Sequence, residues 1–347
     1  MKILGTGLDG LVGSRIVELL KGQYEFESSD VDITDRNKII DKIKSSDASV
    51  VLHLAAKTSV DGCEEDHSSA WAVNVYGTQN IVDACQVSNK KLIYISTDFV
   101  FDGFRPPVGG YKEEDIPSSI NWYGKTKHEG EKIVKNSSAS WIIARIAYPY
   151  RANFARNDFA RAILKRLQDQ KPVAAVTDHI FTPTFIDDIA YALDVLIKSE
   201  SKGIFHVVGS QSLSPYDAAV AIAREFGFDQ KYITKTTRSE FFKNRAPRPF
   251  HLALKNGKIR GLGVRMGGFE EGLQQLKTQN SKLQVKSQKF KHFLILNFVF
   301  AFCILTFEFI FYDYHFHRSW IRWARIRSGF CRPWQYCLGN WTYKRKD

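Results

Sequence analysis

Cysteine is scarce in this sequence of 347 residues, and no two cysteines form a CxxC pair. The five cysteines are Cys63, Cys85, Cys303, Cys331 and Cys337. Thiols this few and this irregularly spaced argue against a disulfide framework and offer no zinc motif. The first residues also lack the pattern of a signal peptide. We therefore expect free thiols, a cytoplasmic protein and no metal site.

Excess charge is missing from most of the chain, although the whole sequence has a formal net charge of +12. From Ser281 onward there are twelve Lys or Arg residues and three Asp or Glu residues, a local charge of +9. The first 280 residues therefore carry only +3. The basic character belongs to the tail, and we expect no nucleic-acid partner for the rest of the chain.

The tail contains a hydrophobic run, 292–312, of about the length that spans a bilayer. Lys289 and Lys291 precede it and an Arg- and Trp-rich segment follows, as at a membrane interface. Glu308 inside the run and the odd composition of 318–347 favour a translated frameshift or readthrough instead. A C-terminal membrane anchor and a non-native extension both stay open. Nucleic-acid binding by this basic, aromatic tail is a third interpretation.

Residues 1–280 contain no internal repeat, but short apolar runs alternate with amphipathic stretches. This alternation predicts an α/β fold with a Rossmann-like, doubly wound parallel sheet whose strands are buried on both faces. The predicted strands are 2–6, 24–28, 49–55, 91–96, 140–147 and 203–209. The predicted helices are 11–22, 35–45, 68–87, 159–168, 187–199 and 214–227. Function should lie at the carboxyl ends of the strands.

A glycine-rich turn, with Gly5, Gly7, Gly10 and Gly13, stands between the first predicted strand and the first predicted helix. It fits both G-x-G-x-x-G and G-x-x-G-x-x-G. Such a turn lets the backbone approach a pyrophosphate and aims the amides of a helix N-terminus at its negative charge. Because the motif follows a strand and opens a helix, we predict a dinucleotide site here.

The adenosine end of that dinucleotide is predicted to lie near Asp30 and Asp32, which follow the second predicted strand. No Arg or Lys stands at the end of this strand to hold a 2′-phosphate, which favours NAD, whereas Arg15 leaves NADP open. The third predicted strand ends at the small residues Ala55 and Ala56, against which a flat cofactor could lie.

Tyr123 and Lys127 stand four residues apart at the start of a predicted helix and therefore share a face, whereas Lys125 points elsewhere. A nearby ammonium lowers the pKa of a phenol and makes proton transfer to or from a carbonyl oxygen feasible. The lysine can also hydrogen-bond the nicotinamide ribose. The fourth predicted strand ends in Ser-Thr-Asp, 96–98, and a hydroxyl there could bond the same substrate oxygen. Together these groups predict a carbonyl reductase.

In their order along the chain, these motifs resemble the extended short-chain dehydrogenase/reductases, and within them the dTDP-4-dehydrorhamnose reductases. The motifs that carry the resemblance are 6–13, 53–66, 94–103 and 121–131. Later segments that look like substrate-lobe landmarks of that family are 144–150, 181–190, 203–219 and 245–259. The resemblance covers 1–278 and implies a sheet drawn mainly from 1–150 and a smaller C-terminal substrate lobe drawn mainly from 146–278. Residues 279–347 lie outside it.

The resemblance implies a role for each matched residue. The implied catalytic residues are Tyr123 as proton donor to a C4 carbonyl, Lys127 as the residue that tunes it, and Thr97. The implied cofactor-binding residues are Gly7, Gly10, Leu11, Val12, Gly13, Asp32, Ile33, Ala55, Ala56, Lys57 and Thr58, together with Tyr123 and Lys127. The implied substrate-binding residues are Thr97, Asp98 and Tyr148, the last of which stands where family members often carry tryptophan.

The implied reaction is the NADPH- or NADH-dependent reduction of the C4 ketone of a dTDP-4-dehydro-6-deoxy sugar, as in dTDP-L-rhamnose biosynthesis, with a homodimer as the implied assembly. The same motifs also resemble the regulatory β subunits of methionine adenosyltransferase, which bind a dinucleotide but act as a partner subunit. Other sugar-nucleotide reductases and epimerases of the extended family are compatible with them too. The intact set of Tyr123, Lys127 and Thr97 favours an enzyme.

Overall fold

The computed structural model describes residues 1–283 and 285, and one compact unit comprises Met1–Ser281. The segment 292–312, for which the sequence predicts a membrane anchor or a non-native extension, lies outside the described residues. Within the part of the chain that is described, no helix is long and apolar enough to cross a membrane.

The centre of the unit is a six-stranded sheet in the order β2-β1-β3-β4-β5-β9, and every neighbouring pair is parallel. The strands are β1 (Lys2–Thr6), β2 (Glu25–Ser29), β3 (Val50–His53), β4 (Lys91–Thr97), β5 (Trp141–Ile146) and β9 (Gly203–His206). The order reverses between β1 and β3, and a ligand crevice opens at the carboxyl ends of strands at such a switch point. The predicted α/β fold with a doubly wound parallel sheet is confirmed.

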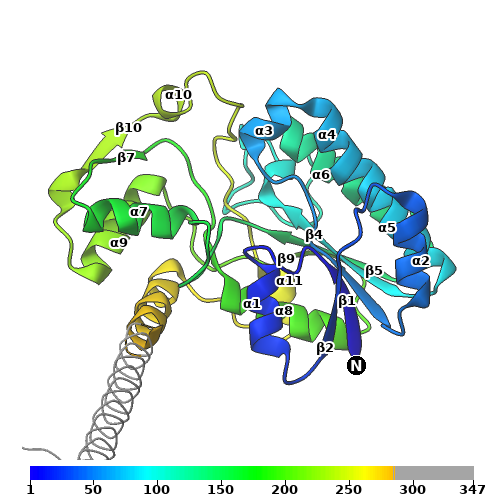
Figure 1. Ribbon diagram of the computed structural model, residues 1–347. Coiled ribbons are helices and arrows are strands. Elements are labelled where there is room, and N and C mark those ends of the chain that lie inside the picture. Colours follow the sequence, from blue (N-terminus) through cyan, green and yellow to red (C-terminus); the bar gives the residue numbers. More distant parts are fainter. Residues whose placement is uncertain (284, 286–347) are drawn as a thin grey trace, which may run out of the picture. The chain divides into compact units, whose positions relative to one another are not determined.

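Helices cover both faces of the sheet (Figure 1), and alternate residues of the strands belong to two different buried clusters. Ile3 and Leu52 belong to one buried cluster, and their neighbours Leu4 and Val51 belong to the other. The first layer consists of α1 (Gly13–Leu20), α8 (Ile186–Lys198) and α11 (Gly257–Gly261). The second consists of α2 (Arg36–Ser45), α5 (Gly77–Val87) and α6 (Trp122–Lys135). Burial of both faces explains why the strands read as continuous apolar runs.

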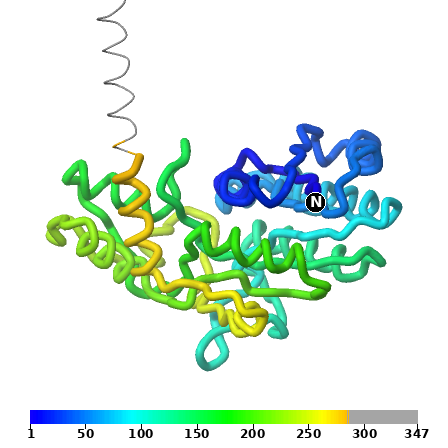
Figure 2. Tube along the Cα trace, turned by 90° about the horizontal axis from the view of Figure 1, so that it is seen from below, coloured from blue at the N-terminus to red at the C-terminus, as the bar shows by residue number. Residues whose placement is uncertain are grey.

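Residues that follow β5 form a smaller lobe with its own buried cluster. Its elements are β6 (Pro149–Tyr150), α7 (Phe159–Gln168), β7 (Val173–Val176), β8 (Thr184–Phe185), α9 (Pro215–Phe226), η3 (Gln230–Tyr232), β10 (Ile233–Thr236) and α10 (Arg238–Phe241). β7 pairs with β10 and β6 with β8. Residues 269–281 are helical and contact this lobe through Phe269 and Leu273 (Figure 2). The predicted range of the smaller lobe, 146–278, also contains β9, α8 and α11, which belong to the central sheet and its first helical layer.

The predicted helix 68–87 is interrupted in the structure. It consists of α4 (His67–Trp71), one π-helical turn (Ala72–Tyr76) and α5 in direct succession. The π turn places Asn74 inward, where it is 1 % exposed. A π turn inserts one residue into a helix, and a single such turn is too short for the inserted residue to be recognised from apolar periodicity. The six-residue helix α3 (Val60–Glu65) is absent from the prediction because it is too short for periodicity to show.

Candidate active site

The glycine turn between β1 and α1 leaves no space for side chains at two positions. Gly7 has a φ of +69°, and a Cβ there would lie 2.9 Å from the backbone nitrogen of Ala55. A Cβ at Gly13 would lie 2.6 Å from the carbonyl oxygen of Gly7. Real Cβ atoms do not approach backbone this closely, so glycine is required at both positions.

The start of α1 can receive an anion. Its N-cap, Val12, has no side-chain capping bond, and its first turn contains no acidic residue. Among the described residues, the amides of Leu11, Val12 and Gly13 donate to no backbone acceptor. Free amides at a helix N-terminus attract phosphate, so these residues and the bare turn fit the pyrophosphate of a dinucleotide.

The predicted adenine end follows β2. The carboxylate of Asp32 accepts hydrogen bonds from Thr34 N at 2.9 Å and Thr34 Oγ1 at 2.8 Å, and these bonds lower its pKa. Ile33 is buried, and its carbonyl oxygen accepts from Asn80 Nδ2 at 2.9 Å. The guanidinium of Arg15 makes two bonds of 2.7 Å to the carboxylate of Asp187. Arg15 is therefore already paired, which weakens the argument from this residue for a 2′-phosphate.

The segment 55–58, predicted to line the cofactor, is held by Asn74 of the π turn. Lys57 N donates to Asn74 Oδ1 at 2.8 Å, and Asn74 Nδ2 donates to Lys57 O at 3.1 Å and to Thr126 Oγ1 at 3.0 Å. Ala55 N donates to Thr6 Oγ1 at 3.3 Å. Asn74 therefore connects the segment after β3 to α6. Asn74 is not among the predicted site residues, because a single polar residue in a helical pattern is normally expected on the surface.

The helix α6 carries Tyr123 and Lys127 at the carboxyl end of β4. Asn121 caps its start by accepting from Gly124 N at 2.8 Å. A Cβ at Gly124 would lie 2.1 Å from the carbonyl oxygen of Phe99, so the first turn packs directly on the segment after β4. Lys127 is 3 % exposed, whereas Lys125 is exposed. The two lysines thus have the different environments that the sequence predicts.

Burial sets the charge of this pair. It lowers the pKa of Lys127 to about 7, with Glu131 opposing the shift, and Lys127 Nζ lies 4.0 Å from the centre of the Tyr94 ring. Burial raises the pKa of Tyr123, while the Thr97 hydroxyl acts in the opposite sense. The sequence analysis expects an ammonium to lower the pKa of Tyr123. In this structure burial dominates the pKa of Tyr123, and the effect of Lys127 on that pKa stays a prediction.

Asp98 has an unpaired oxygen in the interior. It is 2 % exposed, and its Oδ1 accepts from Thr97 Oγ1 at 3.0 Å. Its Oδ2 is buried and has no hydrogen-bond partner among the residues that the structure describes. Burial raises the pKa of this carboxyl to about 7. A buried acceptor of this kind is where a hydroxyl of a bound ligand would be expected.

Tyr148 and Tyr123 both pack on the ring of Phe99. The ring centres of Phe99 and Tyr123 are 5.9 Å apart, and those of Phe99 and Tyr148 are 6.2 Å apart. Tyr148 has a φ of +40°, an uncommon conformation for a residue with a side chain. Its hydroxyl lies 3.1 Å from Nε2 of His179. The sequence analysis does not identify His179, because it is 31 residues away and belongs to no recognisable motif.

A buried ion pair holds the third turn of α6. Glu131 accepts from Arg145 Nε at 2.8 Å and from Arg145 Nη2 at 2.7 Å, and both side chains are 1 % exposed. Ser96 Oγ also donates to Glu131, at 2.6 Å. The pair connects α6 to β5, one helical turn beyond Lys127. The sequence does not reveal this pair, because a glutamate in a helix is normally expected on the solvent-exposed face.

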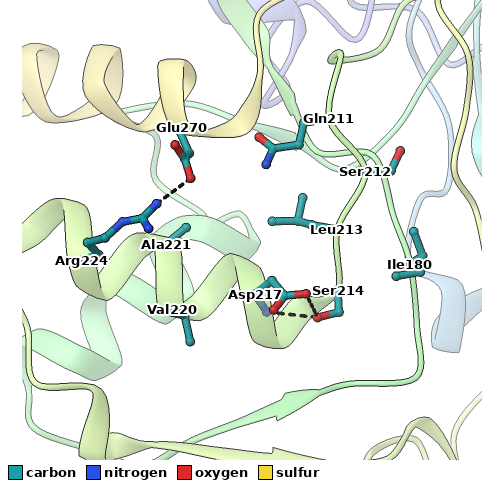
Figure 3. A pocket seen from close by; sticks show the side chains of 10 residues that line it. All are labelled: Ile180, Gln211, Ser212, Leu213, Ser214, Asp217, Val220, Ala221, Arg224 and Glu270. Carbon is teal, nitrogen blue, oxygen red and sulfur yellow. Dashed lines mark hydrogen bonds and ion pairs between the residues drawn. The ribbon is translucent and has the colours of Figure 1, made fainter.

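A pocket of about 450 Å³ lies on the smaller lobe, away from these residues (Figure 3). Its lining comes from Ile180, from the segment before α9, from α9 itself and from Glu270. The polar groups drawn there are already paired, Asp217 with Ser214 and Arg224 with Glu270. No predicted site residue lines it.

The candidate site therefore consists of a dinucleotide turn, a Tyr-Lys pair on a helix, and a Thr-Asp pair at a strand end. This fold and site define the class of NAD(P)-dependent oxidoreductases of the α/β type. The chain matches the RmlD substrate binding domain family over residues 1–281 and belongs to that family. This confirms the predicted resemblance and the predicted enzyme class.

Individual relatives agree with this assignment. The chain is 35 % identical over 235 residues to dTDP-4-dehydrorhamnose reductase of Aggregatibacter actinomycetemcomitans, which covers 65 % of this chain and 79 % of the relative. The crystal structure of the Bacillus anthracis dTDP-4-dehydrorhamnose reductase in complex with NADP is similar with a TM-score of 0.74 and 28 % identity, covering 80 % and 99 % of the two chains. Methionine adenosyltransferase 2 subunit beta of Bos taurus is 29 % identical over 284 residues, 76 % of this chain and 84 % of that one.

Proposed function

We propose that this protein reduces the C4 ketone of a dTDP-4-dehydro-6-deoxy sugar with NADPH or NADH, as dTDP-4-dehydrorhamnose reductase does. One observation carries the proposal. The first turn of α6, with Tyr123, packs on the strand end that holds Thr97 and the unpaired carboxyl oxygen of Asp98. A proton donor thus lies beside groups that can bond a substrate oxygen and a neighbouring hydroxyl.

The residues of the chain divide the work as follows. A nicotinamide held by the glycine turn and the strand ends would supply the hydride. Tyr123, kept protonated by its raised pKa, donates its phenolic proton to the C4 oxygen as that oxygen gains charge. In this structure Thr97 Oγ1 donates to Asp98 Oδ1. Turned toward Tyr123, the same hydroxyl would stabilise the phenolate that remains. Lys127 bonds the ribose, and Asp98 Oδ2 accepts from a sugar hydroxyl.

The cofactor is assigned to the turn and the strand ends around it. Gly7, Gly10 and the amides of Leu11, Val12 and Gly13 would hold the pyrophosphate. Asp32 and Ile33 would contact the adenosine end, and the segment 55–58 would line the cofactor. We assign the whole reaction to residues 1–278, with 279–347 outside the catalytic unit.

The test uses the full chain with NADPH and dTDP-4-dehydro-L-rhamnose. Tyr123→Phe removes the proton donor and should lower kcat by at least ~100-fold, the contribution of a general acid, while the Kd for NADPH stays within about twofold of wild type. Lys127→Met should also lower turnover. The matched control is Lys125→Met, on the exposed face of the same helix, which should turn over at the wild-type rate. Normal turnover by Tyr123→Phe would overturn the assignment.

The second candidate is a regulatory subunit that binds a dinucleotide and performs no reaction. It is favoured by the similarity to methionine adenosyltransferase 2 subunit beta over 284 residues. This candidate predicts that no 4-keto sugar nucleotide is reduced and that the protein co-purifies with a partner enzyme. Reduction of any such sugar nucleotide at the expense of NADPH would exclude it.

A further inference from the structure

We propose that His179 is a positioning residue that holds the ring of Tyr148 in place against the sugar of the substrate. The inference rests on the proposed function, because it concerns the sugar-binding part of the same site. It adds a residue that belongs to none of the motifs of the sequence.

The hydrogen bonds of His179 fix its tautomer. His179 is 2 % exposed, and its Nδ1 lies 2.8 Å from the carbonyl oxygen of Pro249. A carbonyl oxygen only accepts, so Nδ1 carries the hydrogen and Nε2 is left as an acceptor. The Tyr148 hydroxyl, 3.1 Å from Nε2, is therefore the donor. Burial lowers the pKa of His179 to about 4, so the imidazole stays neutral near pH 7 and keeps this arrangement.

The direction of this hydrogen bond gives the two tyrosines of the site, Tyr148 and Tyr123, different roles. The proton of Tyr148 is committed to His179, so Tyr148 offers a substrate its ring and an oxygen lone pair. Tyr123 packs on the same Phe99, and among the described residues its hydroxyl donates to no acceptor comparable to His179. Proton donation therefore falls to Tyr123, and Tyr148 is left to bind by contact.

The position of Tyr148 depends on this support. Its backbone φ of +40° is one that side-chain-bearing residues rarely adopt, so surrounding contacts must maintain it. Phe181 contacts the Tyr148 ring at 4.5 Å between centres and stacks on His179 at 6.0 Å. Ile180, between those two residues, lines the separate pocket of Figure 3 instead. A tyrosine is smaller than the tryptophan that family members often carry here, and the bond to His179 fixes the smaller ring.

The test compares His179→Phe, which keeps an aromatic ring beside Phe181 but cannot accept a hydrogen bond, with His179→Gln. Glutamine can still accept from Tyr148 and donate to Pro249. His179→Phe should raise the KM for dTDP-4-dehydro-L-rhamnose about tenfold, as expected for one lost hydrogen bond. The kcat and the Kd for NADPH should stay within about twofold, and His179→Gln should restore most of the loss. In a Tyr148→Phe background, His179→Phe should have no further effect.

Calorimetric binding of dTDP-L-rhamnose provides a readout that needs no turnover. His179→Phe should weaken it about tenfold, with the effect again absent in the Tyr148→Phe background. An unchanged KM and Kd in His179→Phe would overturn the inference, as would an equal loss in both backgrounds. If His179→Phe fails to fold, His179→Gln is the variant to measure. Sugar-nucleotide binding by His179→Gln as weak as that by Tyr148→Phe would also contradict the inference. A third outcome separates the two proposals. If the wild type binds the sugar nucleotide in a way that depends on His179 but does not reduce it, the proposed reaction is wrong and the role of His179 stands.

Discussion

At the scale of single residues, the site gathers ionisable groups whose burial opposes their charge. The carboxyl of Asp98 and the amine of Lys127 are brought by burial from opposite directions to pKa values of about 7. Groups that titrate near neutral pH are typical of sites that move protons. The sequence identifies both residues, but their pKa values depend on the depth of burial, which only the folded chain sets.

Asp98 makes stability depend on pH in a direction that follows from its shift. The pKa of Asp98 is higher in the folded than in the unfolded chain, so between about pH 4 and pH 7 the folded chain binds more protons than the unfolded chain. The contribution of Asp98 to stability therefore falls as pH rises through this range. Asp98→Asn removes the ionisation. We expect the Tm of this variant minus the Tm of wild type to be larger at pH 8 than at pH 5, as measured by thermal unfolding at both values. A constant Tm difference would show that Asp98 is ionised in the fold at low pH as well.

At the scale of elements, the sequence predicts well wherever the signal is local. All six central strands are predicted, mostly from apolar runs, although β2 is not one. The start of α6 and the glycine turn follow from local motifs. The π turn at Ala72–Tyr76 is not predicted, because a single turn is too short for its inserted residue to show in the periodicity. Strands of two to four residues, such as β6 and β7, are too short to have a period. They form because of the neighbours with which they pair.

The glycine turn offers a sharp test of one element. Gly13→Ala would place a Cβ 2.6 Å from the Gly7 carbonyl oxygen, so the turn must move. We expect the free energy of unfolding to fall by ~1–3 kcal/mol and NADPH binding to weaken by at least ~10-fold. Gly22→Ala is the matched control, since a Cβ there meets nothing within 4 Å. Equal NADPH affinities in the two variants would exclude this turn as the pyrophosphate site.

The ion pair between α6 and β5 gives a second test at this scale. Arg145→Met leaves the carboxylate of Glu131 buried without its partner, which should cost ~3–5 kcal/mol in urea unfolding. The double variant with Glu131→Gln should recover much of that loss, because no uncompensated charge remains. Lys132→Met, which removes an exposed pair with Glu129, should change stability by less than about 1 kcal/mol. Equal effects of Arg145→Met and Lys132→Met would contradict a structural role for the buried pair.

At the scale of the whole molecule, the site is assembled from distant parts of the chain. The catalytic and dinucleotide motifs lie in the part of the chain that forms most of the central sheet. Each is a short stretch of sequence that can be recognised by itself, so the sequence identifies them. The contacts of Tyr148 depend on His179 and on the carbonyl of Pro249, which come from two later segments. A single sequence contains no period or motif that relates residues at these separations. The parts of the site that recognise a sugar are therefore less predictable than the parts that recognise a cofactor.

The central claim is that the chain is a reductase of a dTDP-4-keto sugar. The most direct measurement follows NADPH oxidation and product formation by the purified full-length protein with dTDP-4-dehydro-L-rhamnose. The account predicts one NADPH oxidised for each dTDP-L-rhamnose formed. NADPH binding without oxidation, with this substrate and with other 4-keto sugar nucleotides, would contradict it and favour a regulatory subunit.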